Sequence, residues 1–131
     1  KAAAVEGGAK VHLASGAIGG FDVLQTVTLM AQAQGLPETA GIETHTGAKG
    51  FRNTPVWAEH LLTDTEKTTV FTGNAKQTMH SVPGWVGDDH CITAKIEGVK
   101  AVVDICSSTS AIAGWSAVSL LRNLASPVCF Y

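Results

Sequence analysis

Four residues of the kinds that bind metals and transfer protons stand next to one another near the middle of the chain, at Asp88, Asp89, His90 and Cys91. Catalytic and metal sites are built mainly from carboxylates, imidazoles and thiolates. All four can serve one site only if their side chains point to the same place. The secondary structure expected for this stretch therefore decides between an active site and a structural segment.

The stretch leads into a predicted β-hairpin over residues 90–106. Two runs rich in β-branched residues flank Glu97-Gly98, a two-residue turn in which the glycine can adopt a positive φ. With this turn, counting outward along both strands places His90 opposite Ile105. Because successive side chains of a strand point to opposite faces, the register also predicts which residues share a face.

Strand alternation separates the four residues. His90 falls on the apolar face of the hairpin, whereas Asp89 and Cys91 point to the other face. We interpret His90 as a histidine at the edge of the core, with one ring nitrogen hydrogen-bonded. Asp88 lies in the turn before the hairpin, which leaves it able to join a neighbouring group such as His80.

The elements that must position these residues are predicted from hydrophobic periodicity. Apolar residues at helical spacing predict one helix over residues 21–34, closed by Gly35, and another over about 109–125. The pattern of residues 55–63 favours a short helix, with a strand as the alternative. Residues 9–14 and 68–72 are predicted strands.

Together these elements predict an α+β two-layer sandwich. It comprises an antiparallel sheet with a C-terminal β-hairpin (about 90–106), followed by a packed helix (about 109–125). At 131 residues the chain is long enough for one hydrophobic core, so we expect residues 1–131 to form a single globular domain.

The composition excludes several classes of partner. Charged residues make up 15% of the chain, the formal net charge is -2, and Lys and Arg are scattered singly, so we expect no nucleic acid partner. No apolar run reaches the roughly 20 residues of a membrane-spanning helix. The chain contains neither a Walker lysine motif nor a GxGxxG motif, and we expect no cofactor.

Three cysteines and a first residue, Lys1, that is not Met indicate a processed, extracellular protein, with cytoplasmic or virion locations as alternatives. In an oxidising compartment we expect Cys106 to pair with Cys129, because the intervening helix could return the tail beside its own start. In a reducing compartment, all three cysteines would be small buried thiols.

Two functions fit these observations. The first is a small processed, secreted, non-enzymatic protein that binds a protein partner or self-assembles, like a toxin, an effector or a coat subunit. A hairpin followed by a terminal helix is similar to the C-terminal arrangement of small RNA-phage coat proteins. Trp85, in a turn, is the candidate partner contact.

The alternative function is a small enzyme, or a subunit of one, with a loop-built site around His80 and Asp88 that could be metal-dependent and could include His45. The histidines lack the HExxH and HxH spacings of common metal sites, and no catalytic motif occurs. We therefore assign no metal ligand and no catalytic residue from the sequence, and the binding protein is the favoured hypothesis.

Overall fold

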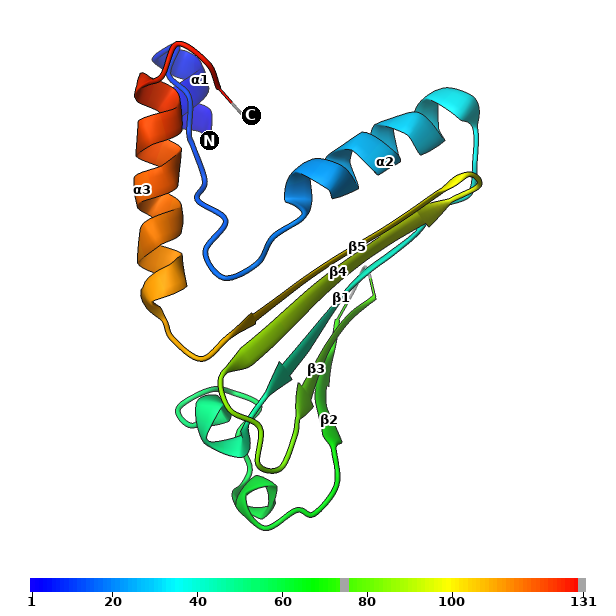
Figure 1. The fold of residues 1–131 in the computed structure, drawn as a ribbon, viewed down its shortest axis with the longest axis vertical. Coiled ribbons are helices and arrows are strands. Elements are labelled where there is room, and N and C mark those ends of the chain that lie inside the picture. Colours follow the sequence, from blue (N-terminus) through cyan, green and yellow to red (C-terminus); the bar gives the residue numbers. More distant parts are fainter. Residues whose placement is uncertain (74–75, 130–131) are drawn as a thin grey trace.

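The structure, a computed structural model, describes residues 1–73 and 76–129, which form a five-stranded sheet with helices around it (Figure 1). The strands are β1 (Thr39–Thr46), β2 (Thr68–Thr72), β3 (Gln77–Ser81), β4 (Asp88–Ile96) and β5 (Val99–Ser107). The helices are α1 (Ala2–Glu6), α2 (Phe21–Gln34) and α3 (Ala111–Ala125), and two short 3-10 helices, η1 (Ala48–Phe51) and η2 (Glu59–Leu62), connect β1 to β2.

The predicted α+β class is confirmed. The strands lie in the order β2-β3-β1-β4-β5. β1 and β3 are parallel, and the other neighbouring strands are antiparallel, so the sheet is mixed. No helix in the described part of the chain is long and apolar enough to cross a membrane.

The predicted hairpin is confirmed in its register. His90 lies opposite Ile105 and Asp89 opposite Cys106, and Gly98 in the turn has a φ of 85°. Ile92, Ala94 and Ile96, which alternate along β4, are buried, as the alternation predicts.

Helix α2 covers the apolar face of the hairpin and completes the core. Its predicted bounds are confirmed, and Gly35 ends it in the left-handed conformation with a φ of 64°. Val27 and Ala31 of α2 pack in one cluster with Ala94 and Ile96 of β4. Burying a side chain such as Val27 stabilises the fold by about 1.5–3 kcal/mol, so this cluster fixes which face of the sheet is closed.

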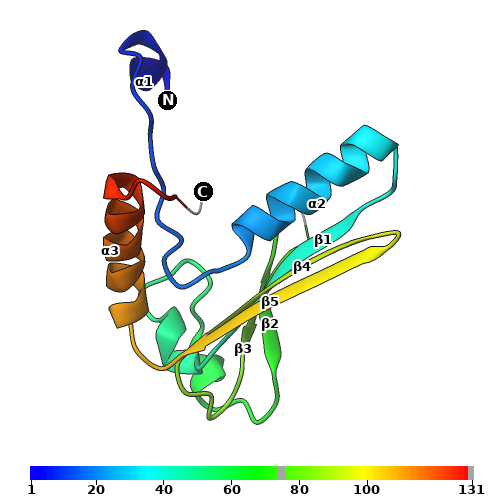
Figure 2. The ribbon, with the colours of Figure 1, turned by 45° about the horizontal axis from the view of Figure 1, so that its top comes forward.

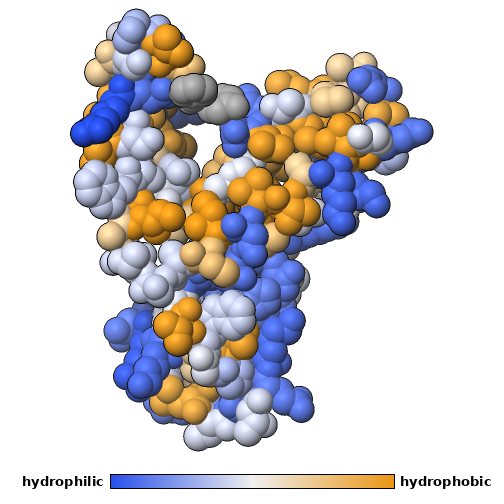
Figure 3. Space-filling view, in the orientation of Figure 1, coloured by the Kyte–Doolittle hydropathy of each residue, from blue (hydrophilic) through white to orange (hydrophobic). Residues whose placement is uncertain are grey.

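Helix α3 follows the hairpin as predicted and stands at the end of β5 (Figures 1 and 2). Its Ser116 Oγ accepts a hydrogen bond from the Gly16 amide at 3.0 Å, and α3 and residues 13–22 line a groove of about 1010 Å³. Apolar atoms gather over α2 and over the region between α2 and α3 (Figure 3). No residue of α3 is buried, so the closed face of the hairpin owes its burial to α2.

The N-terminal segment differs from the prediction. Residues 9–14 form no strand, because the segment pairs with no neighbour and leaves Val11 and Leu13 largely exposed. The glycine-rich residues that follow have a structural role. A Cβ on Gly19 would overlap Ile105, and Gly20 directly before α2 has a φ of 91°, so the glycines let this segment approach β5 closely.

The connection between β1 and β2 contains helical turns only in part of the predicted range. Within residues 55–63, η2 (Glu59–Leu62) is a 3-10 helix that buries Leu61. The strand predicted over 68–72 is confirmed as β2.

The predicted disulfide is wrong, since all three cysteines are free thiols. Cys106 precedes the start of α3 at Ala111, and Cys129 follows its end at Ala125, so the length of the helix lies between them. A helix of this length spans roughly 22 Å at 1.5 Å per residue. The tail therefore does not return beside Cys106.

Gly87, directly before β4, should be far less replaceable than Gly84 in the same loop. Both have a positive φ, but only at Gly87 would a Cβ overlap a backbone group, the Ser107 carbonyl. We expect Gly84→Ala to cost only the strain of a left-handed residue, about 1–2 kcal/mol. Gly87→Ala must also displace β5 and should cost at least about 1 kcal/mol more in urea unfolding. Equal losses would contradict this account.

Candidate functional site

The face of the sheet opposite α2, here called the open face, carries a row of polar side chains. His45 of β1 pairs in register with His80 of β3 on one side and with Asp89 of β4 on the other. The row continues to Thr69 of β2 and to Cys106 of β5. Because directly paired residues share a face, five strands bring one polar residue each to the same line.

Glu43 lies on the same face as this row, two residues before His45. Its Oε1 lies 3.0 Å from His80 Nε2 and 3.4 Å from His45 Nε2. One carboxylate oxygen therefore meets both imidazoles. The side chain of Glu43 is 48% exposed, whereas that of His80 is only 10% exposed. Glu43 is the member of this group that a solute can reach.

His80 is held from both ring nitrogens. Its Nδ1 lies 3.0 Å from Thr69 Oγ1, while its Nε2 faces Glu43. Desolvation by burial and the positive charge of Lys67 lower the pKa of His80 below its ordinary value, although Glu43 opposes them. The surroundings therefore favour the neutral form of this imidazole.

His45 lies between Glu43 on one side and Asp89 on the other. Its ring stacks on that of His80, with centroids 5.1 Å apart, and contacts the ring of Trp85 at 5.6 Å. Its Nδ1 is 4.0 Å from Asp89 Oδ2, too far for a hydrogen bond. This nitrogen and Asp89 Oδ1 are both buried and have no hydrogen-bond partner among the described residues.

Beyond His45, Asp89 forms a second group with Asp104 and Cys106 of β5. A hydrogen bond shared with Asp89, together with desolvation, raises the pKa of the Asp104 carboxyl above its ordinary value. Desolvation and the same carboxylates raise the pKa of Cys106, and desolvation raises that of Cys91. Neither thiol is therefore favoured as a thiolate nucleophile.

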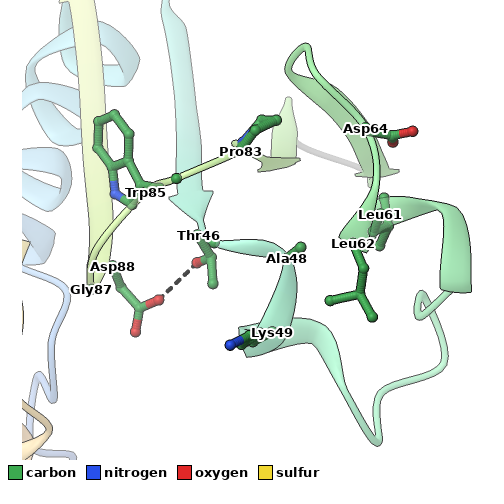
Figure 4. Close-up of a pocket in the computed structure, with 13 residues that line it drawn as sticks. Thr46, Ala48, Lys49, Leu61, Leu62, Asp64, Pro83, Trp85, Gly87 and Asp88 are labelled. Atoms are coloured by element: carbon green, nitrogen blue, oxygen red, sulfur yellow. Dashed lines mark hydrogen bonds between the residues drawn. The ribbon is translucent and has the colours of Figure 1, made fainter.

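The structure does not bring His80 and Asp88 together. Asp88 pairs in register with Thr46, on the face opposite His45, and its Oδ1 accepts a hydrogen bond from Thr46 Oγ1 at 2.8 Å (Figure 4). It lines a pocket of about 520 Å³ between η1, η2 and the loop before β4. The loop-built site expected from the sequence is thus replaced by a strand-built one, in which His80 meets His45 and Glu43.

The remaining sequence-predicted residues fall into place around these groups. His90 is a core-edge histidine as interpreted, with its Nδ1 2.9 Å from Thr44 Oγ1. Trp85 is 37% exposed, lines the Asp88 pocket and contacts His45. Whether Trp85 contacts a partner stays a prediction.

Glu43 is the site residue that the sequence analysis missed. The signal was present in the Glu43-Thr44-His45 order, because residues two apart on a strand share a face. Recognising it requires knowing that β1 is a strand and that β3 pairs beside it. The second condition is a non-local pairing that no local pattern announces.

The fold is similar to part of a solved structure. No family model matches the sequence, and no curated protein matches it. Among solved structures, the chain is similar to aspartate dehydrogenase from Thermotoga maritima, with a TM-score of 0.66 and 22% sequence identity. The match covers 94% of this chain and 57% of that protein, so the chain spans little more than half the length of its structural neighbour.

This match corrects the favoured prediction of a secreted, non-enzymatic, toxin-like or coat-like protein. The prediction depended on low charge, a non-Met first residue and an expected disulfide. The cysteines are free, and the fold is similar to part of aspartate dehydrogenase, which does not support a toxin or a coat subunit. The enzyme alternative fits these findings better.

Asp104→Asn should stabilise the protein at neutral pH. Because the pKa of Asp104 is raised on folding, the native state favours the protonated carboxyl, and stability falls as pH rises from the ordinary value of 3.8 through the folded pKa. Asparagine can donate to Asp89 at every pH. We expect a gain below about 1 kcal/mol, since the pair is partly solvated, and the gain should vanish below the unfolded pKa.

Thermal unfolding of the wild type and of Asp104→Asn across acidic and neutral pH measures this difference. Glu97→Gln, which removes a carboxylate in the hairpin turn, is the control and should leave the pH dependence as it is. A variant that is less stable than the wild type at neutral pH would contradict the interpretation.

Proposed function

We propose that the chain is an enzyme, or part of one, related in fold to aspartate dehydrogenase, and that its open face binds the amino group of a small substrate and transfers a proton with it. The observation that carries the proposal is the convergence of two imidazoles on Glu43. The dehydrogenase fold supports the enzyme class, and the residues themselves support the chemistry.

The hydrogen-bonding pattern around His80 supports proton transfer. With a hydrogen on Nε2, the imidazole donates to Glu43, and its Nδ1 accepts from the Thr69 hydroxyl. This arrangement fixes one tautomer and one ring orientation. A carboxylate and an imidazole 3.0 Å apart can share one proton, as a general acid–base pair requires.

The charge of the open face favours an amine over an acid at this point. Glu43 contacts both imidazoles, and Asp89 lies 4.0 Å from His45. These two carboxylates outnumber the single positive charge of Lys67, which acts on His80, so a substrate ammonium group would be attracted and a carboxylate repelled. An ammonium group that contacts the exposed carboxylate of Glu43 lies one hydrogen bond away from His80. Oxidation of an amine requires the ammonium to lose a proton first, and the pair of Glu43 and His80 can accept that proton.

The described residues do not fit the dinucleotide that a dehydrogenase uses. The glycine-rich residues 16–20 lack the GxGxxG spacing, and the crossover between the parallel strands β1 and β3 contains 3-10 turns and β2. Dinucleotide sites instead use a helix whose N-terminus meets the pyrophosphate. No hydride-transfer step is therefore assigned to these residues.

Binding of an amino acid should be visible at the imidazoles. We expect L-aspartate, or another amino acid from a panel, to shift the imidazole NMR resonances of His45 and His80, while those of His60 and His12 stay in place. His80→Gln should weaken this affinity roughly tenfold, the loss of one hydrogen bond to a charged group.

His60→Gln is the matched control, because His60 is an exposed histidine whose ion pair with Asp64 lies outside the open-face row. It should bind as the wild type does. If no amino acid shifts the two resonances, or if His80→Gln binds as tightly as the wild type, the proposal fails.

A further inference from the structure

We propose that Glu43, His45 and His80 form a binding site for a divalent transition metal ion of the zinc class. Two imidazoles and one carboxylate are a donor set that such ions bind in proteins. The inference stands on the geometry of these three side chains and does not depend on the proposed substrate.

The ligand atoms are already close to the spacing that a metal needs. One nitrogen of each imidazole and one oxygen of Glu43 lie within 4.8 Å of one another, and the two contacts with Glu43 Oε1 are 3.0 and 3.4 Å. Ligands bound at about 2.0–2.1 Å in a tetrahedron lie roughly 3.3 Å apart. An ion could enter with small side-chain movements, because Glu43 is half exposed.

The strands provide a rigid support. His45 and His80 are register partners on the parallel strands β1 and β3, and Glu43 is two residues before His45 on the same face. Because all three ligands lie on two paired strands, no loop has to become ordered when the ion binds. A site on strands is more precisely positioned than one on loops.

The Nδ1 atoms of the two imidazoles, which face away from Glu43, give a second, independent indication of a metal site. Metal-bound histidines usually donate their other N–H to an oxygen. His80 Nδ1 already lies 3.0 Å from Thr69 Oγ1, and the buried, unpartnered Nδ1 of His45 faces Asp89 at 4.0 Å.

A metal on His45 Nε2 would place the ring hydrogen on Nδ1, where it can donate to Asp89. When His45 Nε2 carries the hydrogen instead, Nδ1 presents a lone pair to a buried carboxylate. Metal binding therefore directs the Nδ1 hydrogen of His45, a buried atom that the described residues leave without a partner, toward the Asp89 carboxylate.

The donor set also selects the class of metal. Magnesium and calcium prefer oxygen ligands only, so nitrogen from two imidazoles favours zinc, cobalt, nickel or copper. The exposed side of Glu43 leaves room for water or a small ligand in the remaining coordination position. Since metal and substrate amine would use the same atoms, zinc should compete with the amino acid proposed above.

Cobalt(II) and zinc(II) chloride are the probes. We expect isothermal titration of the chelator-treated protein to show one zinc ion per chain. Cobalt should give the visible absorption of a four- or five-coordinate nitrogen–oxygen site without a thiolate charge-transfer band. In the wild-type protein, cobalt should shift or broaden the imidazole resonances of His45 and His80 together, which tests the site without any substitution.

Glu43→Gln and His45→Gln each remove a proposed ligand and should weaken zinc binding by more than about 100-fold. Thr69→Val removes the hydrogen-bond partner of the ligand His80 and should weaken zinc binding by roughly 10- to 100-fold. His60→Gln and Cys106→Ser are controls that should bind as the wild type does. Circular dichroism with excess chelator shows whether each variant folds. Unchanged affinity in His45→Gln, or loss of affinity in Cys106→Ser, would overturn the proposal. These outcomes concern the metal alone, so they do not decide the amino acid experiment.

Discussion

The side-chain alternation of β4 is the constraint on which both the core and the candidate site depend. β4 is paired along its length with β1 on one side and β5 on the other, so its register cannot slip by one residue without moving every side chain to the wrong face. Ala94 and Ile96 are thereby held against α2, and Ile92 is buried on the same face. The same constraint holds Asp89 on the open face beside His45.

Local patterns were sufficient for the elements whose partners are close in sequence. The hairpin register, the bounds of α2 and its glycine cap follow from residues within one turn or one strand pair, and each is confirmed. Strand alternation also predicted that His90 and Asp89 point to opposite faces of the sheet, because alternation needs no knowledge of the rest of the fold. The opening run of four residues is thus divided between the edge of the core and the open face.

What could not be predicted is the pairing of distant segments. β1 and β3 are parallel neighbours with β2 between them in sequence, and this crossover alone brings Glu43 beside His80. The same limitation explains the strand wrongly predicted over residues 9–14. An extended apolar pattern becomes a strand only where a neighbour supplies hydrogen bonds, and the glycine-rich residues 16–20 instead direct the chain into α2.

The open face is costly as a purely structural surface. A buried polar atom without a partner costs about 1–3 kcal/mol, and His45 Nδ1 and Asp89 Oδ1 are two such atoms on adjacent strands. Val102 of β5 shows that the same face can carry an apolar side chain. Imidazoles and carboxylates at the centre of the face are therefore not required by the sheet. They make physical sense if a positively charged group, whether an ammonium or a metal ion, contacts Glu43 and the imidazoles.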